Sequence, residues 1–372
     1  MKKRMIIAGG GTGGHLFPGL AIASEFVKRS SEHEVLFVGT AHGIEARAVP
    51  EAGYRFEAIP SQGIAGRSYI DRIKAALIIP WSVLSALRVV GRFQPDLAVG
   101  VGGYVSGPVL LAARLRGVPC AIHEQNAVPG WTNRILGRFC RAVFVSFEKA
   151  SERFPRAARK GRVFVAGNPV RKDILEFLQN RNHASQDRPG TDAGILVVGG
   201  SQGAHGLNLL MADALVELSR NRGHRLKVRH QSGERDAPEL KAKYEKAGLE
   251  VSVEPFIKEM GDAYLEADLV ISRAGAGAVA EIALAGKPSI LVPFPYAAGD
   301  HQADNARVLV DAGAALMFRE GETDSHSVAE AVSSLLENEE KRRDMAERAQ
   351  EAARPEAAAE IVEHCLAIME SS

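Results

Sequence analysis

The sequence predicts an α/β protein of two similar domains, each with a parallel β-sheet covered by helices. Two stretches half a chain apart read almost alike, since each is an apolar run that ends in glycines: MIIAGGGTGG at 5–14 and ILVVGGSQGA at 195–204. A parallel strand packs against helices on both faces, which explains why each run is apolar throughout. The glycines allow a sharp turn, and the next helix presents unpaired N–H groups to an anion. With 372 residues, the chain has room for two such domains.

The amino-acid composition limits the classes of protein to which this chain can belong. The 46 basic and 45 acidic residues nearly balance, so bulk charge does not indicate a nucleic-acid partner. The three cysteines form no metal-binding spacing, which favours buried thiols in a reducing compartment. The apolar run after Lys2, Lys3 and Arg4 is too short for a signal peptide, and no run approaches the roughly 20 residues that span a bilayer. We therefore expect a cytoplasmic protein that is not integral to a membrane.

The first half alternates short apolar runs with segments of helical periodicity, which predicts a parallel sheet covered on both faces. The apolar runs predict strands at 4–9, 34–39, 55–59, 97–100, 119–123, 142–146 and 163–166. The periodic segments predict helices at 15–30, 43–52, 70–92, 107–117, 130–139 and 148–153.

A polar stretch at 180–194 has no clear periodicity and is typical of a surface loop, after which the alternation restarts. Strands are expected at 194–199, 225–230, 250–253, 269–272, 289–292 and 314–317. Helices are expected at 205–221, 236–247, 259–265, 276–285, 301–312 and 325–337. The tail at 339–370 is helical and becomes apolar on one side, so it needs a surface to pack against; Pro169 is a candidate hinge between the halves.

The first glycine cluster formally satisfies the dinucleotide-binding pattern G-x-G-x-x-G. That fold needs an acid at the end of its second strand, whereas the strand at 34–39 ends in Gly39-Thr40. NAD or FAD is therefore not favoured, and glycines that serve only a tight turn remain an alternative. His15 falls in the first turn of the following helix, at the mouth of the loop, which makes it a candidate for chemistry.

Two further polar or glycine-rich loops follow strands of the same sheet. The segment 100–108 reads GVGGYVSGP, and 123–126 reads HEQN. Open parallel sheets bind ligands at the carboxyl ends of their strands. Taken singly, each residue suits an ordinary loop; together, the loops predict one face of a binding site.

The second half repeats this arrangement. Small residues at 274–280 join a strand to a helix and leave backbone amides free to meet phosphate, while Glu281 lies where a carboxylate could accept bonds from ribose. A favourable charge near a helix start is the alternative for Glu281. The loop from Pro293 to Asn305 ends in side chains suited to sugar hydroxyls. There is no DxD pair after a strand, GxSxG, HExxH or Walker lysine, so no metal is predicted.

The segment 70–92 is unusually apolar for a surface helix, and five basic residues against one acid lie across 67–92. It is either a core helix broken by Pro80 or a patch that dips into an anionic membrane surface. In the second case Ile79 and Trp81 would enter the membrane, and Lys74 and Arg88 would face its charge.

Seven motifs together resemble the MurG family, the bacterial N-acetylglucosaminyltransferases of peptidoglycan synthesis. They occur in the family's order and span almost the whole chain: GGGTGGH (9–15), GGYVSGP (102–108), HEQN (123–126), GNPVR (167–171), GGSQGA (199–204), RAGA…AE (273–281) and DHQADNA (300–306).

The resemblance implies a GT-B fold, two Rossmann-like domains facing across a cleft. It implies inverting, metal-independent transfer of GlcNAc from UDP-GlcNAc to the MurNAc 4-hydroxyl of undecaprenyl-diphospho-MurNAc-pentapeptide (lipid I), which forms lipid II, without a cofactor. Such an enzyme would act at the cytoplasmic face of the inner membrane as a peripheral protein, with a role in cell shape and division. Its partners would be UDP-GlcNAc, lipid I, the anionic membrane surface and cell-wall or division proteins, with no nucleic acid.

The resemblance also implies domain limits: 1–165 for lipid I and the membrane, 166–348 for UDP-GlcNAc, and a terminal helix at 349–372 that packs back on the first domain. Another GT-B enzyme, such as a diacylglycerol glycosyltransferase or a UDP-GlcNAc 2-epimerase, is the alternative. An epimerase needs carboxylates around the sugar and no acceptor loop, and the loop at 102–108 argues against it.

The family's site residues carry over by position. Those implied for the donor are Thr12, Gly13, Gly14, Asn126, Arg171, Ser201, Ile257, Ala276, Gly277, Ala278, Val279, Ala280, Glu281 and Gln302. Those expected for the acceptor are Gly11, Gly103, Tyr104 and Ser106. His15 is the first candidate for the catalytic base and Glu124 the second, and the residues alone do not decide between them. One departure from the family is Gly277-Ala278, where a hydroxyl residue is usual, so phosphate contacts there would come from backbone N–H groups.

Overall fold

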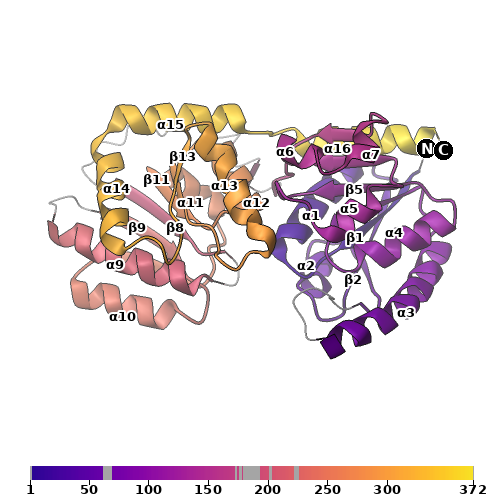
Figure 1. Cartoon of the computed structure of the whole chain (residues 1–372), viewed down its shortest axis with the longest axis horizontal. Coiled ribbons are helices and arrows are strands. Elements are labelled where there is room, and N and C mark those ends of the chain that lie inside the picture. The colour runs from indigo at the N-terminus through magenta and orange to yellow at the C-terminus, as the bar shows by residue number, and fades with distance from the viewer. Residues whose placement is uncertain are drawn as a thin grey trace. The chain divides into compact units, whose positions relative to one another are not determined.

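The computed structural model describes residues 2–61, 69–171, 174–175, 178, 193–200, 203–221 and 226–371, with 69–77, 221 and 298 described for their backbone alone. The chain divides into two compact units (Figure 1). Unit 1 comprises Met1–Arg171 and Arg354–Ser372, and unit 2 comprises Lys172–Ala353.

Unit 1 contains a seven-stranded sheet in the order β3-β2-β1-β4-β5-β6-β7, in which every neighbouring pair is parallel. Its strands are β1 (Arg4–Gly9), β2 (Glu34–Gly39), β3 (Arg55–Ala58), β4 (Leu97–Gly102), β5 (Cys120–Glu124), β6 (Ala142–Val145) and β7 (Val163–Val165). Its helices are α1 (Gly13–Arg29), α2 (Glu45–Glu51), α3 (Tyr69–Phe93), α4 (Ser106–Leu115), α5 (Trp131–Leu136), α6 (Glu148–Ser151), α7 (Pro155–Ala158) and α16 (Ala357–Glu370).

The alternation of side chains along β1 produces two cores in unit 1, one on each face of the sheet. Ile6 and Ala8 point into the core that α3 and α4 cover. Met5 and Ile7 point into the other core, which α1 and α16 cover. The apolar side of the terminal segment therefore has its packing surface in unit 1.

Unit 2 repeats the arrangement with a six-stranded parallel sheet in the order β10-β9-β8-β11-β12-β13. Its strands are β8 (Ala193–Val198), β9 (Leu226–Gln231), β10 (Val251–Glu254), β11 (Leu269–Ser272), β12 (Ser289–Leu291) and β13 (Ala315–Met317). Its helices are α9 (His205–Asn221), α10 (Ala237–Ala247), α11 (Met260–Glu266), α12 (Ala276–Ala285), the 3-10 turn η1 (Ala298–Asp300), α13 (His301–Asp311), α14 (Ser325–Glu337) and α15 (Glu339–Ala352).

The structure differs from the predicted elements in a few places, among them the unpredicted 3-10 turn η1. The short helix α7 was not predicted, and the tail forms two helices, α15 and α16, separated by 353–356 with Pro355. A proline removes a backbone donor and disfavours helical geometry in the residue before it, which explains the break. The segment predicted as one helix at 70–92 is confirmed as α3, which runs through Pro80, so a helix broken there is excluded.

Candidate active site

Three of the predicted loops meet at the carboxyl edge of the sheet in unit 1. They follow β1, β4 and β5, which are neighbours in the sheet. The loops touch so closely that a Cβ atom on Gly102 would lie 2.5 Å from Nδ1 of His15, and one on Gly103 would lie 2.6 Å from the carbonyl oxygen of Gly10. Both glycines also have positive φ, of 103° and 79°. Glycine is therefore required at both positions for the loops to come together.

His15 lies half-buried in the first turn of α1. Its Nδ1 is 3.1 Å from Oε1 of Gln125, which follows β5. Gln125 is itself buried and lies 3.0 Å from Nδ1 of His123 through its Nε2. The glycine loop and the HEQN motif thus form one hydrogen-bonded cluster.

Glu124 is buried and engaged by its own loop. Its Oε1 accepts bonds from the backbone N–H and the side-chain amide of Asn126, at 3.0 and 3.4 Å. Its Oε2 accepts bonds from the N–H of Gly130 and the amide of Asn133, at 3.1 and 2.9 Å. Burial raises the pKa of this carboxyl, and these bonds only partly oppose the shift. This arrangement orders the loop after β5.

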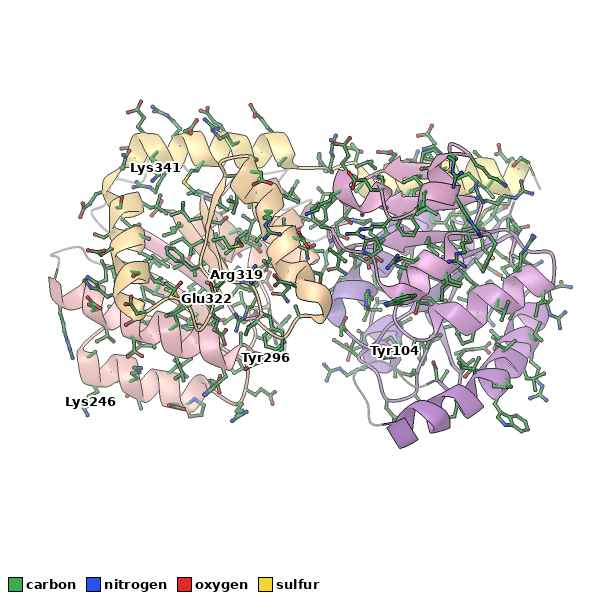
Figure 2. The ribbon with its side chains drawn as sticks, viewed as in Figure 1. Tyr104, Lys246, Tyr296, Arg319, Glu322 and Lys341 are labelled. Carbon is green, nitrogen blue, oxygen red and sulfur yellow. The ribbon has the colours of Figure 1, made fainter. Side chains whose placement is uncertain are left out.

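The acceptor candidates differ in their surroundings. Ser106 is buried, and its Oγ accepts a bond from the N–H of Gly102 and lies 2.8 Å from the carbonyl oxygen of Ala8, so it connects β1 to β4. The N–H of Gly11 donates to a buried carboxylate. Tyr104, labelled in Figure 2, is 53% exposed and leaves its ring at the surface of unit 1.

The carboxylate that Gly11 meets belongs to Glu45, a residue that the sequence analysis missed. Glu45 is buried at the start of α2, and it accepts bonds from Gly11 N–H at 2.8 Å and from the N–H and hydroxyl of Thr40 at 2.9 and 2.8 Å. Burial raises the pKa of Glu45, but these bonds outweigh it and leave the pKa below its ordinary value. The sequence signal is an acid five residues beyond Thr40, and it was missed because the dinucleotide-binding pattern places its acid at the end of the second strand.

The remaining donor candidates of unit 1 lie around α1. Thr12 is the N-cap residue of α1, but its side chain makes no capping bond. Gly13 and Gly14 form the first turn. The guanidinium of Arg171 lies 5.3 Å from the centre of the Phe17 ring, a cation–π distance that places Arg171 beside α1.

In unit 2 the small-residue segment 276–280 begins α12, with Gly275 as its N-cap residue. Apart from the helix's own backbone and the neighbouring residues, no atom of the described part of the chain lies within 4 Å of a Cβ placed on Gly277, so a ligand could approach this turn. Glu281 lies beyond the first turn, which excludes a simple interaction with the helix start. Its Oε2 accepts a bond from the hydroxyl of the buried Tyr264 at 3.1 Å.

Two further residues of unit 2 that are candidates for binding UDP-GlcNAc form hydrogen bonds within the protein. The N–H of the buried Ile257 donates to Oε1 of Gln231 at 2.9 Å. Oε1 of Gln302 accepts a bond from the N–H of Phe294 at 2.9 Å. Gln302 therefore stabilises the loop that carries Pro293-Phe294-Pro295.

A buried arginine also stabilises that loop, and its role was not anticipated. Nη1 of Arg273 donates to the carbonyl oxygens of Val292 and Pro293, each at 3.2 Å, while Nη2 pairs with Glu320. The guanidinium also lies 5.6 Å from the ring centre of Phe294. Arg273 thus connects the loops that follow β11, β12 and β13.

Ser201 lies outside the described residues, and so does the side chain of Lys74. The other membrane candidates lie on α3, where Ile79 and Trp81 are 41% and 66% exposed and Arg88 is also exposed. Farther along the same helix, Ala86 and Val90 are buried in the core. One face of this helix therefore belongs to the core, while the face that carries Ile79, Trp81 and Arg88 is exposed.

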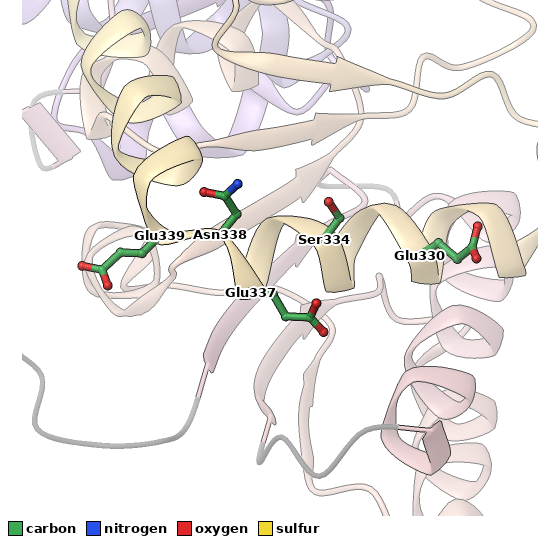
Figure 3. Close-up of a pocket in the computed structure, with 5 residues that line it drawn as sticks. All are labelled: Glu330, Ser334, Glu337, Asn338 and Glu339. Carbon is green, nitrogen blue, oxygen red and sulfur yellow. The ribbon is translucent and has the colours of Figure 1, made fainter.

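Figure 3 shows a pocket of unit 2 at the junction of α14 and α15, and none of its lining residues belongs to the candidate loops. Its lining residues are Glu330, Ser334, Glu337, Asn338 and Glu339. Three carboxylates in one pocket would repel a diphosphate. Within the described ranges, no group of three or more His, Cys, Asp or Glu side chains is arranged to hold a metal ion.

Comparison with known families gives matches along both units. The description "Glycosyltransferase family 28 N-terminal domain" matches residues 5–145, and "Glycosyltransferase family 28 C-terminal domain" matches residues 194–361.

Two curated relatives carry the name UDP-N-acetylglucosamine–N-acetylmuramyl-(pentapeptide) pyrophosphoryl-undecaprenol N-acetylglucosamine transferase. The protein from Myxococcus xanthus is 45% identical, and the match covers 98% of this chain and 93% of that protein. The protein from Geobacter sulfurreducens is 43% identical, and the match covers 98% of both chains.

Solved structures agree on the architecture. The crystal structure of Acinetobacter baumannii MurG has a TM-score of 0.77 and 33% identity, and the match covers 97% of this chain and 98% of that one. A UDP-GlcNAc 2-epimerase from Neisseria meningitidis, bound to UDP-GlcNAc, has a TM-score of 0.69 at 14% identity over 98% of this chain and all of that one. At that identity the second likeness shows the fold alone, which is the GT-B fold.

Proposed function

This chain belongs to glycosyltransferase family 28, and from that premise we propose that it transfers GlcNAc from UDP-GlcNAc to the MurNAc 4-hydroxyl of lipid I, forming lipid II. The observation that carries the proposal is the match over nearly the full chain, at 42–45% identity, to transferases named for this reaction. The MurG structure supports the same activity.

The chemistry requires a base and a means of stabilising the leaving group. The acceptor hydroxyl loses its proton as it attacks the anomeric carbon, while UDP leaves with additional negative charge. We assign the base to His15, because Gln125 holds its ring at the mouth of the glycine loop. Both oxygens of Glu124 already accept bonds from its own loop, which favours a positioning role for that residue.

Candidate residues for the sugar donor occur in each unit. Backbone amides at 276–280 suit the diphosphate, Glu281 suits the ribose, and Gln302 suits the sugar hydroxyls. Ser201, Arg171 and Asn126 remain donor candidates, as do Thr12–Gly14. The N–H of Ile257 already donates to Gln231. Uracil would therefore bind the carbonyl oxygen of Ile257, or Gln231 would have to move to free the N–H.

Turnover is expected to survive a chelator. Helix N-termini and loop amides can stabilise a leaving diphosphate without a divalent bridge. The measurement is the rate of GlcNAc transfer in excess EDTA, compared with the rate in added Mg²⁺ or Mn²⁺. Loss of turnover in EDTA that either metal restores would contradict this assignment.

The decisive assay of the function supplies UDP-GlcNAc with a short-chain lipid I analogue. Formation of the disaccharide product is expected, with no transfer to diacylglycerol in a parallel reaction. Transfer to diacylglycerol alone, or conversion of UDP-GlcNAc to its 2-epimer without an acceptor, would establish one of the alternatives instead.

The acceptor carries a lipid tail, so the enzyme must reach a membrane surface. None of the helices in the described ranges is long and apolar enough to cross a bilayer. Three helices of unit 1, with α3 against α4 and α4 against α5, carry exposed apolar side chains. We name this set the apolar patch: Ile79, Trp81, Leu84, Leu111, Leu115, Trp131 and Ile135.

Basic side chains accompany the apolar patch. Arg88, Arg114 and Arg134 are exposed on the same three helices, and Arg134 lies 5.1 Å from the centre of the Trp131 ring. Exposed apolar side chains with cations on the same helices suit the interface of an anionic leaflet, to which each cation adds about 1 kcal/mol of attraction. We therefore propose peripheral binding to the cytoplasmic face of the inner membrane through this patch. Cell-wall or division proteins remain proposed further partners.

A variant with serine at Ile79 and Trp81 and glutamate at Lys74 and Arg88 is expected to lose binding to anionic vesicles. The change removes apolar contact and reverses two charges, while turnover of a water-soluble acceptor should be largely retained. Vesicle co-sedimentation at low and high salt measures the effect, since salt screens the attraction. A folded variant that still binds vesicles like the wild type would place the membrane surface elsewhere, and an unfolded variant would show that these side chains are needed for folding and contradict their assignment to the membrane.

A further inference from the structure

We propose that Gln125 and His123 are positioning residues that fix the tautomer of His15, with the proton on Nδ1 and Nε2 left as the bare, basic nitrogen. The inference rests on the proposed function, because it concerns how the assigned base is prepared. The evidence is a series of hydrogen bonds that begins at a backbone carbonyl group and ends at His15. All of its members belong to unit 1.

The series begins at the carbonyl oxygen of Gly167. This oxygen can only accept, and it lies 3.1 Å from Nε2 of the buried His123, so Nε2 carries a proton. The hydrogen bonds of Ser146 are consistent with a proton on Nε2 of His123. Its Oγ donates its own proton to the carbonyl oxygen of Glu124 at 3.2 Å, so toward Nε2, 3.4 Å away, it can only accept.

His123 must therefore present a bare Nδ1 to Gln125. Burial lowers the pKa of His123 to about 4, and the ring is neutral near pH 7. A neutral imidazole with its proton on Nε2 is an acceptor at Nδ1. The group facing Nδ1 must then be the amide nitrogen of Gln125, which lies 3.0 Å away.

The orientation of the Gln125 amide follows from a second carbonyl. Its Nε2 lies 2.9 Å from the carbonyl oxygen of Val101, which again can only accept. The two protons on Nε2 are thus directed to Val101 and His123, so Oε1 faces His15. At 3.1 Å from Nδ1 of His15, Oε1 can only accept, and His15 must donate from Nδ1.

The direction of the hydrogen bond between His15 and Gln125 determines whether His15 can act as a base. In a neutral imidazole one ring nitrogen is a donor and the other an acceptor, and only the bare nitrogen can take a proton from a hydroxyl. The opposite tautomer would present N–H to the acceptor. In serine proteases, an aspartate orients the catalytic histidine. Replacing this aspartate with asparagine leaves the histidine in the wrong tautomer and lowers kcat by about 10⁴-fold. Gln125 is neutral, so we expect a smaller loss, of about 10- to 100-fold, the scale found when the partner that orients a metal-bound histidine is removed.

The direct test is ¹⁵N nuclear magnetic resonance of protein labelled at its histidine rings, with His15 assigned from the spectrum of His15→Ala. In the wild type at neutral pH, we expect His15 to show its proton on Nδ1 and His123 on Nε2. In Gln125→Leu, His15 should shift toward the Nε2–H form or a mixture. A wild-type His15 with its proton on Nε2 would overturn the inference. The experiment needs no substrate, so it is separate from the test of the proposed function.

Kinetics supply the second readout. Gln125→Leu is expected to lower kcat by about 10- to 100-fold with little change in KM for UDP-GlcNAc. In the His15→Ala background the same substitution should change kcat little, because no base remains to be positioned. An equal loss of kcat in both backgrounds would show that Gln125 acts through general stability and would contradict the inference.

Discussion

His15→Ala is expected to lower kcat by about 10²- to 10⁴-fold, the range typical of a general base. A base acts on the transition state, so UDP-GlcNAc should bind the variant about as well as it binds the wild type. Replacement with alanine also leaves Oε1 of Gln125 without the donor that lies 3.1 Å away. That loss is local to the loop, and the core of unit 1 does not include His15.

The measurement combines calorimetry of UDP-GlcNAc binding with kcat at saturating donor and acceptor. Thermal unfolding of the same variant provides the control for folding. Weak UDP-GlcNAc binding with kcat intact would make His15 a donor ligand, and catalysis would then have to be assigned to another group.

Glu281→Ala is expected to lower kcat/KM for UDP-GlcNAc by roughly 10- to 150-fold. The ribose would lose a charged acceptor, and a hydrogen bond to a charged group contributes about 1.5–3 kcal/mol. Tyr264→Phe is the matched control, since it removes the hydroxyl that donates to Glu281 at 3.1 Å and leaves the carboxylate in place. The control should have a smaller effect than Glu281→Ala.

Competition with nucleotides separates the role of Glu281 further. The substitution should weaken UDP binding more than it weakens binding of a 2′,3′-dideoxyribose analogue of UDP, which lacks the hydroxyls. Equal use of UDP-GlcNAc by Glu281→Ala and the wild type would show that the ribose lies elsewhere.

The elements with the strongest sequence signals were predicted to within a few residues. Helices α9, α12 and α14 begin and end where their periodicity predicts, and β2 and β11 match their apolar runs. Parallel strands buried on both faces leave a continuous apolar run, and this signal is local in the sequence. These signals predicted two α/β units with parallel sheets, and the GT-B fold was implied by the resemblance of the motifs to the MurG family.

The polar interactions that order the loops were less predictable. Glu45 contacts Gly11, which is 34 residues away, and Arg273 pairs with Glu320, which is 47 residues away. Neither pair forms a local pattern, since each depends on how separate loops meet at a sheet edge. For the same reason, the sequence placed His123, Gln125 and His15 near one edge but could not give the direction of their hydrogen bonds.

The position of α16 has a consequence for how the chain folds during synthesis. Unit 2 is one continuous segment inserted between two parts of unit 1, so it is synthesised before residues 354–372, which form the second part of unit 1. Until then, the sheet face that carries Met5 and Ile7 lacks the helix that buries Ile361 and Val362 against it. The domain synthesised first therefore finishes folding last. Exposed apolar surface on such an intermediate favours aggregation, and truncation of the tail would make that state permanent.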